Sequence, residues 1–461
     1  MTTRSLVLAG LLSIGMAGWF MRWNVAQLPV HADESLLAPT PPMGWNSWDA
    51  YGTTINEADF KANVAWFARY LKPFGWRYVV VDMEWYVTNP IPEGNSKTSQ
   101  FSIDQYGRYI PAVNRFPSSS NCAGFKPIAD YVHSLGLKFG IHILRGIPKE
   151  AVAKNLPIEA SRARAPDVSD KKEACPWNPD NYALDVTKPA AQGYYDSILK
   201  LYAEWGVDFI KADCVASRPY NGDDIRMLDA ARRKTGRPMV LSLSPGEAPV
   251  EKLAELRQHS ELWRISDDVW DLWHSAVAYP QGLGDQFPRI VKWAPLVEPG
   301  HWPDADMLAV GYLGPAPGWS KPRQTQLTHE EQRTLLTLWS VMRSPLMVGA
   351  NLTKNDAWTT ALLTNPEVIG VNQRPSEKPR VTATEASLVW AAKTDAGSKW
   401  NLAVFNLQDR PQRIRYEWKD VGLEPRKHTL RNLWQHTDVD DVASLDVTLP
   451  AHGCALYRAM H

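Results

Sequence analysis

The chain has 461 residues, and its 50 lysines and arginines are balanced by 50 aspartates and glutamates. This length is sufficient for one barrel-sized domain and a smaller companion domain. Because the net charge is zero, the composition argues against nucleic acid or an anionic membrane surface as a partner. The 21 tryptophans could stack on sugar rings, but tryptophans also fill protein cores, so they only suggest a carbohydrate ligand.

The N-terminal segment is typical of a secretory signal peptide. Arg4 precedes an apolar run over residues 6–20, and small residues at 30–32 offer a cleavage site before Asp33. The run is short for a membrane-spanning helix. We therefore expect residues 1–32 to direct export to the periplasm or outside the cell, with no stable membrane association after cleavage. An uncleaved anchor is the alternative, because Arg22-Trp23 follows the apolar run.

The four cysteines are Cys122, Cys175, Cys214 and Cys454. No two of them have the spacing of a metal site, so the sequence predicts no bound zinc. Export permits disulfides, and Cys175 with Cys214 is the candidate pair because each lies near the end of a predicted strand. Cys454 lies in an apolar strand and is predicted to be a buried thiol.

Alternating strand and helix patterns extend from Pro41 to about Gln373 and are typical of βα units. Roughly eight units in this length favour a closed (β/α)8 barrel over an open doubly wound sheet, and no glycine-rich turn follows the first strand as a dinucleotide-binding fold would require. The predicted strands are residues 44–48, 78–81, 138–143, 207–210, 239–243, 262–265 and 346–348.

Two helices carry clear start signals. Asn56 is a predicted N-cap for a helix whose apolar residues recur at helical spacing, namely Phe60, Val64, Phe67 and Leu71. Thr328 and Glu331 form a capping box for a later helix that runs to about Met342. A further helix is predicted over residues 190–205.

The sequence pattern changes after Pro379. Short strand-like runs at residues 388–392, 402–406, 414–418 and 445–449 are separated by polar turns. This pattern predicts an all-β sandwich. We expect a catalytic barrel over residues 38–377 and a C-terminal β-sandwich domain over residues 378–461.

The segment from Phe209 to Cys214 is the most informative in the chain. Strand alternation would place Phe209, Lys211 and Asp213 on one face, so that both charged groups emerge at the carboxyl end of the strand. Barrel enzymes present catalytic groups at this position. A buried Lys–Asp pair or a helix-capping aspartate would be the simpler explanation of the segment on its own.

Further acids end or flank other strand-like runs: Asp82, Asp267, Asp268, Asp304 and Asp306. In a barrel they would converge with Asp213 on one mouth. Hydrolysis of a glycosidic bond needs two carboxyl groups, one that protonates the leaving oxygen and one that attacks the anomeric carbon or activates water. Lys211 would favour the ionised form of Asp213, whereas a neighbouring carboxylate would favour the protonated form of Asp268.

Residues 41–373 resemble glycoside hydrolase family 27, the α-galactosidase family, at a series of ordered sites. Lys211-Ala212-Asp213 corresponds to the family's Lys-x-Asp motif. The interval from Arg264 to Asp268 keeps its Arg-x-x-x-Asp spacing, which selects Asp268 over Asp267. The other matching segments are Pro42 to Trp48, Val81 to Trp85, Gly136 to Ile141 and Trp302 to Leu308.

The resemblance implies a barrel enzyme that retains anomeric configuration through a covalent glycosyl-enzyme, with no cofactor and no metal. Asp213 would be the nucleophile and Asp268 the general acid/base. The substrate-binding residues implied by the family are Trp45 on the sugar face, Asp82 and Lys211 on distant hydroxyls, Arg264 beside the anomeric carbon, and Asp306 closing the pocket.

Several departures from the family pattern fall in the sugar pocket. Met83 replaces the family's second consecutive aspartate, and Glu84 occupies the following position. His142 stands where a tyrosine is usual and is expected to be a hydrogen-bonding residue at the rim. Cys214 follows Asp213 directly instead of two positions later, and Ser244-Pro245 replaces the Glu-Trp of many members.

We therefore expect a retaining, exo-acting hydrolase of oligosaccharide or polysaccharide glycosides, with α-galactosidase as the leading activity. The alternatives in the same family are a β-L-arabinopyranosidase, whose sugar lacks the exocyclic CH2OH, and an isomaltodextranase-like enzyme. The alternative from another class is a non-catalytic carbohydrate-binding protein, but the presence of both Asp213 and Asp268 argues against it. The sequence makes no prediction of oligomeric state.

Overall fold

The computed structural model describes residues 36–91, 98–314, 321–394 and 399–460. The predicted signal peptide, residues 1–32, lies outside these ranges. Within them, no helix combines the length and the apolar character needed to cross a bilayer.

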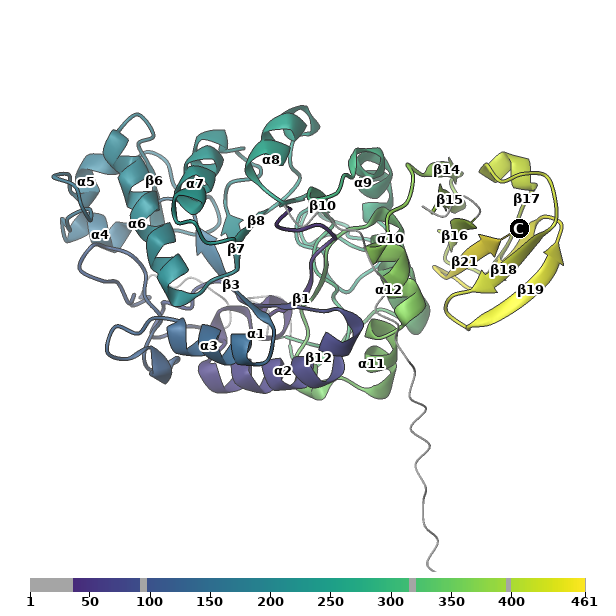
Figure 1. Ribbon diagram of the computed structural model, residues 1–461, viewed down its shortest axis with the longest axis horizontal. Helices are drawn as coiled ribbons and strands as arrows, with labels where there is room; N and C mark the ends of the chain where they lie inside the picture. The colour runs from purple at the N-terminus through teal and green to yellow at the C-terminus, as the bar shows by residue number, and fades with distance from the viewer. Residues whose placement is uncertain (1–35, 92–97, 315–320, 395–398, 461) are drawn as a thin grey trace, which may run out of the picture. The chain divides into compact units, whose positions relative to one another are not determined.

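Eight parallel strands form the barrel (Figure 1). In sheet order they are β10 (Trp302–Asp304), β9 (Leu262–Arg264), β8 (Val240–Leu243), β7 (Phe209–Asp213), β3 (Lys138–Leu144), β2 (Tyr78–Val81), β1 (Met43–Asn46) and β13 (Leu346–Val348). Leu308, just after β10, pairs in parallel with Val348 of β13, and its N–H donates to Met347 O at 2.8 Å. This pairing brings the two ends of the sheet together, which confirms the predicted (β/α)8 barrel.

The largest differences from the sequence-based expectation concern two strands. The fourth strand was expected over residues 207–210, but β7 runs from Phe209 to Asp213 because its ladder with β3 continues to the pair Leu144 and Asp213. No strand was expected at residues 302–304, where β10 is only three residues long. So short a strand leaves too little alternation to identify it from the sequence.

Helices surround the strands (Figure 1). The longer ones are α2 (Glu57–Tyr70), α3 (Lys126–Ser134), α6 (Pro189–Trp205), α7 (Gly222–Lys234), α8 (Leu253–His259), α9 (Gln286–Trp293), α10 (His329–Met342), α11 (Ala357–Leu363) and α12 (Pro366–Gln373). The short ones are α1 (Trp48–Tyr51), α4 (Lys149–Ala153) and α5 (Ala165–Val168). Short strands outside the barrel are β4 (Ile147–Pro148), β5 (Ser169–Asp170), β6 (Asn181–Leu184), β11 (Tyr312–Leu313) and β12 (Arg323–Gln324).

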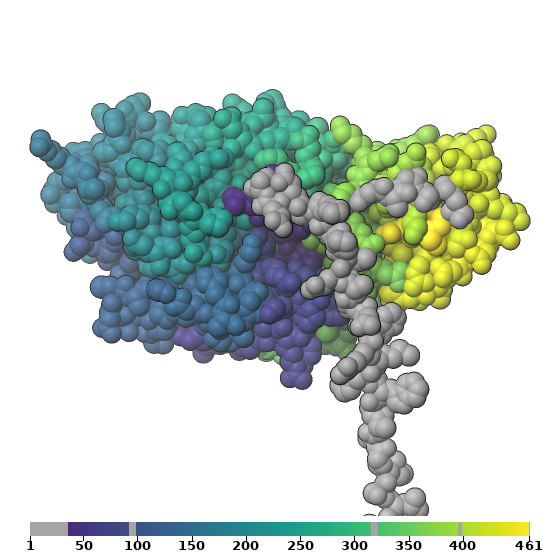
Figure 2. All heavy atoms as spheres, viewed as in Figure 1, coloured from purple at the N-terminus to yellow at the C-terminus, as the bar shows by residue number. Residues whose placement is uncertain are grey.

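Both predicted helix starts are confirmed. The Asn56 side chain accepts from Asp59 N–H at the start of α2, and Thr328 with Glu331 forms the complete capping box of α10. The helix α2 also contacts the segment that follows the last barrel strand. Asn63 in α2 accepts from Leu352 N–H, in the short turn after β13, at 2.7 Å. Figure 2 shows the same face of the molecule as Figure 1, with side chains filling the spaces between the ribbons.

Strand alternation divides the buried side chains into two clusters. On β7, Ile210 and Ala212 belong to the large cluster between strands and helices, whereas Phe209 belongs to a smaller cluster with the strand residues Tyr78 and Val240. Lys211 and Asp213 continue the face of Phe209 toward the carboxyl end of the barrel. The predicted alternation at this segment is therefore confirmed.

We expect Phe67→Ala to destabilise the protein by about 3–5 kcal/mol, since it removes a ring from a packed core and leaves a cavity. Phe67 on α2 is fully buried. Urea denaturation followed by fluorescence measures the loss. Tyr70→Ala, on the same helix but 37% exposed, is the matched control and should cost much less. Equal losses for the two variants would contradict the assignment of Phe67 to the core.

The C-terminal residues form two antiparallel sheets, which confirms the predicted all-β domain. One sheet has the order β14 (Arg380–Ala383), β15 (Ser387–Lys393), β16 (Lys399–Asn406), β21 (Cys454–Met460), β18 (His428–Asn432) and β19 (Thr437–Val442). The other pairs β17 (Gln412–Tyr416) with β20 (Leu445–Leu449). The boundary near residue 378 stays a prediction.

The two faces of the larger C-terminal sheet have different partners. Val389 and Leu402 pack with Ile414 of the second sheet. The alternate residues, such as Phe405, belong to the barrel's helix-side cluster, and Phe405 meets Phe287 of α9 with ring centroids 5.2 Å apart. One face of the sheet therefore packs on the barrel, and the other face packs on the second sheet of the C-terminal domain.

Candidate active site

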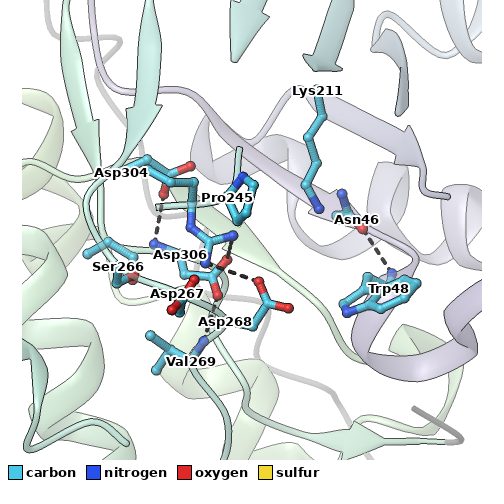
Figure 3. A network of polar contacts seen from close by, with 12 residues as sticks. Asn46, Trp48, Lys211, Pro245, Ser266, Asp267, Asp268, Val269, Asp304 and Asp306 are labelled. Carbon is cyan, nitrogen blue, oxygen red and sulfur yellow. Dashed lines mark hydrogen bonds and ion pairs between the residues drawn. The ribbon is translucent and has the colours of Figure 1, made fainter. Parts of the chain in front are cut away.

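Charged side chains converge where the barrel strands end, because parallel strands direct their carboxyl ends to the same mouth. Asp82 follows β2, Asp213 ends β7, Asp268 follows β9 and Asp306 follows β10. In Figure 3, Lys211 and Trp48 lie on one side of this mouth, with Asp268 and Asp306 on the other. The predicted convergence of the acids is therefore confirmed.

Asp82 and Lys211 form an ion pair. Lys211 Nζ lies 2.9 Å from Asp82 Oδ2, which also accepts from Asn46 Nδ2 at 2.6 Å. The other carboxylate oxygen accepts from Met83 N–H at 2.9 Å. Burial alone would raise the pKa of Asp82, but the charge of Lys211 and these hydrogen bonds lower it to about 2. Asp82 is thus a fixed carboxylate that accepts hydrogen bonds.

Asp213 is held by hydrogen bonds to both of its oxygens. His142 Nε2 lies 3.0 Å from Oδ2, and Cys214 N–H donates to Oδ1 at 2.7 Å. Burial would raise the pKa of Asp213, but the hydrogen bond and charge of His142, together with Lys211, hold it below its ordinary value. The carboxylate is therefore kept ionised.

A disulfide lies directly beside this carboxylate. Cys175 and Cys214 are bonded, with their Cα atoms 5.9 Å apart, as the sequence predicted. The bond joins the end of β7 to the segment that precedes β6. Cys454 is a buried free thiol, also as predicted.

Arg264 connects two further acids. Its Nη1 lies 2.8 Å from Asp306 Oδ1, and its Nη2 lies 3.2 Å from Asp268 Oδ1. Tyr279 donates from its hydroxyl to Asp268 Oδ2 at 2.8 Å. Both oxygens of Asp268 therefore have donors, while its side chain stays 25% exposed at the mouth (Figure 3).

Asp306 lies in an unusual electrostatic environment. Burial raises its pKa to about 7, and the charges of Asp268 and Asp304 act in the same direction against the attraction of Arg264. Val269 N–H donates to Asp306 Oδ2 at 2.7 Å. This hydrogen bond ties the segment after Asp268 to the segment after β10.

The adjacent acids Asp267 and Asp268 have different partners. Asp267 pairs with Arg218 of the loop after β7, and its side chain is 8% exposed. Asp268 is bound by Arg264 and Tyr279. The selection of Asp268 over Asp267 stays a prediction from the motif spacing.

Trp45 does not occupy the position expected from the resemblance. It is fully buried, donates from Nε1 to Ala350 O at 2.7 Å, and packs on Phe60 of α2 with ring centroids 5.7 Å apart. This burial contradicts the expectation that Trp45 packs on a sugar, because alternation on β1 turns it toward the helices. Trp48 instead belongs to the cluster inside the barrel and lies on the same side of the mouth as Lys211 in Figure 3.

The residues that depart from the family pattern have defined surroundings. Met83 is half-buried and packs against the cluster inside the barrel. Glu84 is buried, its Oε1 lies 3.5 Å from Asn178 Nδ2, and burial together with the charge of Asp180 raises its pKa to about 8. Met83 therefore presents an apolar thioether where the family has a carboxylate.

Besides Trp48, three site residues were missed in the sequence. Asn46 lies within a recognised motif but its contact with Asp82 depends on neighbouring strands. Tyr279 comes from an irregular loop that has no periodic signal. Asp49 is buried under the mouth, where burial and the charge of Asp306 raise its pKa.

Comparisons with known proteins agree with this geometry. The family model described as Alpha galactosidase A matches residues 184–374, and that of the Alpha galactosidase C-terminal beta sandwich domain matches residues 384–459. A GH27 β-L-arabinopyranosidase from Geobacillus stearothermophilus is 43% identical, with 92% of this chain and 97% of that chain covered and a TM-score of 0.88. This chain belongs to glycoside hydrolase family 27.

Two α-galactosidases are similar at lower identity. The α-galactosidase of Cyamopsis tetragonoloba is 28% identical over 92% of this chain and 87% of that protein. The structure of α-galactosidase I from Mortierella vinacea shares the fold with a TM-score of 0.70 at 24% identity, covering 92% of this chain and 98% of that chain. The predicted family and its glycoside hydrolase activity are confirmed.

No metal site is evident in the part of the chain that the structure describes: no three histidine, cysteine, aspartate or glutamate side chains there are grouped as metal ligands. At the mouth, Lys211 pairs with Asp82, and Arg264 pairs with Asp306.

Proposed function

We propose that this family 27 enzyme removes terminal β-L-arabinopyranosyl residues from glycosides with retention of configuration. The observation that carries the choice of sugar is Met83. β-L-Arabinopyranose has the ring configuration of α-D-galactopyranose without the exocyclic CH2OH. A methionine cannot replace the hydrogen bonds that a carboxylate offers to hydroxyls, whereas it can pack on a sugar edge that has no such group.

Similarity supports the same choice. The arabinopyranosidase of Geobacillus stearothermophilus is 43% identical to this chain, against 28% for the α-galactosidase of Cyamopsis tetragonoloba. The second candidate is α-galactosidase. The matching family model, described as Alpha galactosidase A, favours this activity. The Asp82–Lys211 pair is compatible with it, because the pair would bind hydroxyls that galactose and arabinopyranose have in common.

In the first step, an oxygen of ionised Asp213 attacks the anomeric carbon while Asp268 protonates the leaving oxygen. The low pKa of Asp213 and its hydrogen bonds to His142 and Cys214 suit an anionic nucleophile. In the second step, Asp268 takes a proton from water, which attacks the same carbon and releases Asp213.

The remaining residues of the mouth bind and orient the sugar. Asp82 would accept hydrogen bonds from distant hydroxyls while Lys211 donates to them. Arg264, held between Asp306 and Asp268, would address the hydroxyl beside the anomeric carbon. We assign the sugar-stacking position to Trp48, which lies inside the barrel on the same side of the mouth as Lys211.

Met83→Asp tests the proposed sugar preference. We expect the ratio of kcat/KM for aryl β-L-arabinopyranoside to that for aryl α-galactoside to fall by about 100-fold, because the new carboxylate accepts from the exocyclic hydroxyl and is left unpaired beside arabinose. Met83→Leu, which stays apolar, is the control and should keep the preference. If the unaltered enzyme already prefers the galactoside, the second candidate is correct.

His142→Phe should move the acidic limb of the pH profile. The lowered pKa of Asp213 depends on the hydrogen bond and charge of His142, so their loss raises that pKa. Because Asp213 acts as the anion, kcat/KM should then begin to fall at a higher pH. His142→Gln keeps an N–H donor and should shift the limb less. An unchanged limb in the phenylalanine variant would show that His142 does not control ionisation.

We also propose export of the mature enzyme with removal of residues 1–32. The Cys175–Cys214 disulfide supports export, since such bonds persist in oxidising compartments. N-terminal sequencing of the mature protein tests the cleavage site. An intact N-terminus would support the anchor alternative.

A further inference from the structure

The loop at residues 269–285, between β9 and α9, is folded back on itself. Its two limbs are joined by backbone hydrogen bonds. Leu283 N–H donates to Leu272 O at 2.8 Å, and Gly284 N–H donates to Trp273 O at 2.7 Å. The base of the loop is therefore held by its own backbone.

The carboxylate of Asp285, just before α9, ties the same two limbs together. Its Oδ1 lies 2.8 Å from His274 Nδ1, and its Oδ2 accepts from Ser275 N–H at 3.1 Å and from Gly282 N–H at 2.8 Å. The limbs are so close that a Cβ atom at Gly282 would lie 2.3 Å from Trp273 O. A displacement of Trp273 would therefore move both limbs.

This loop carries Tyr279 to the proposed general acid. The Tyr279 hydroxyl donates to Asp268 Oδ2 at 2.8 Å, whereas Arg264 Nη2 lies 3.2 Å from the other oxygen. Tyr279 is 40% exposed, so burial does little to fix it. The orientation of the Asp268 carboxyl group thus depends on where the loop places Tyr279. A displacement of about 1 Å at a reacting group can cost about 100-fold in rate.

A residue of the C-terminal domain stacks on the base of this loop. His452 lies in the turn between β20 and β21, and its ring is 3.8 Å from that of Trp273 between centroids, with an interplanar angle of 9°. Trp273 also packs on Phe287 of α9, with centroids 6.1 Å apart. The indole ring is therefore held between a barrel helix and the C-terminal domain.

His452 is itself fixed by partners in both domains. Its Nδ1 lies 2.8 Å from Glu331 Oε1 of α10, and its Nε2 lies 2.8 Å from Asp409 Oδ1 of the loop after β16. The Thr334 hydroxyl donates to its carbonyl oxygen at 2.6 Å. Its backbone has a φ of 55°, which glycine adopts with less strain. What a histidine adds at this turn is therefore its ring.

We infer that His452 of the C-terminal domain is a positioning residue for the proposed general acid. Its ring fixes Trp273 and thereby the base of the loop, and the loop fixes Tyr279 against Asp268. This inference rests on the proposed function, because it takes Asp268 as the acid. The C-terminal domain would thus act on the first chemical step through the loop.

His452→Asn tests this role, because asparagine tolerates the left-handed turn but removes the ring. Initial rates give kcat/KM over a series of aryl glycosides of the sugar that the enzyme prefers. For the poorest leaving groups, we expect kcat/KM to fall about tenfold, the scale of losing a hydrogen bond to a charged group. For the dinitrophenyl glycoside, which needs no proton, it should change less than about twofold. Tyr279→Phe should give the same pattern.

A double variant shows whether His452 acts through Tyr279. Substitutions that disturb one shared contact give losses that do not multiply, whereas independent disturbances do multiply. His452→Asn combined with Tyr279→Phe should therefore lose about tenfold on the poorest leaving groups, and not about 100-fold. Trp273→Leu removes the other ring of the stack and should behave like His452→Asn, alone and combined with Tyr279→Phe. It takes the place of His452→Asn if thermal unfolding shows that this variant does not fold.

The matched control is His436→Asn. His436 also has a left-handed backbone, with a φ of 58°, and also joins the C-terminal domain to the barrel, with its Nδ1 2.6 Å from Glu367 Oε1 of α12. This variant should keep the leaving-group dependence of the unaltered enzyme. The same change in His436→Asn as in His452→Asn would overturn the inference, because any loosening between the domains would then suffice.

Two further results would also overturn it. One is a loss in His452→Asn that is equal for all leaving groups, and the other is losses that multiply in the double variant. Asp268→Ala separates this failure from that of the proposed function. If Asp268→Ala shows a steep leaving-group dependence but His452→Asn does not, the positioning role fails alone. If Asp268→Ala shows none, or the unaltered enzyme cleaves no aryl glycoside, both proposals fail.

Discussion

Asp213→Asn should reduce kcat on the order of 10⁵-fold or more, which is the scale of loss when an enzyme loses its nucleophile. The substituted amide is uncharged and a poor nucleophile, so the glycosyl-enzyme would not form. The change is nearly isosteric. The side-chain oxygen can still accept from Cys214 N–H, as Asp213 Oδ1 does at 2.7 Å. Fold and sugar binding should therefore persist.

Hydrolysis of aryl β-L-arabinopyranoside gives the activity, and thermal unfolding checks the fold. Asp267→Asn, three residues after the end of β9 and paired with Arg218, is the control and should lose far less activity. Asp213→Gly extends the test, because added azide can then attack the anomeric carbon in place of the carboxylate and give a glycosyl azide of inverted configuration. Near-normal turnover in Asp213→Asn would remove the nucleophile assignment.

Asp268→Ala should have effects that depend on the leaving group. Oxygen leaving groups of high pKa need a proton in the transition state, so kcat/KM on a disaccharide should fall about 10²–10⁴-fold. A dinitrophenolate leaves without a proton, so kcat/KM for the dinitrophenyl glycoside should change much less. The second step also loses its base, so kcat should fall for both substrates.

The comparison with Asp267→Ala makes this test specific. Asp268 is bound by Arg264 and Tyr279 at the mouth, whereas Asp267 is bound by Arg218 beside it. Measuring kcat/KM for both variants over a series of aryl leaving groups gives the dependence on leaving-group pKa. A steep dependence in Asp268→Ala alone is expected. Equal losses across the series, or a larger effect in Asp267→Ala, would contradict the assignment of the acid.

Local signals in the sequence determined much of the fold. The helix α2 was predicted from its N-cap and apolar spacing, because capping and helical periodicity act within a few residues. Strand alternation predicted that Lys211 and Asp213 share one face, because alternation also acts between residues that are close together in the chain. The family's ordered motifs, including Arg264 with Asp268, identified the barrel and its hydrolase chemistry.

Tertiary structure decided what depends on neighbouring strands and loops. β10 is too short to show a period, and β7 reaches Asp213 only because β3 continues to pair with it. Alternation on β1 sends neighbouring side chains to opposite faces, but it is the packing of Trp45 on Phe60 of α2 that places Trp45 on the helix side, away from the mouth. The contact of Tyr279 with Asp268 depends on the path of an irregular loop. These features arise from contacts between residues far apart in the chain, for which local propensity carries no signal.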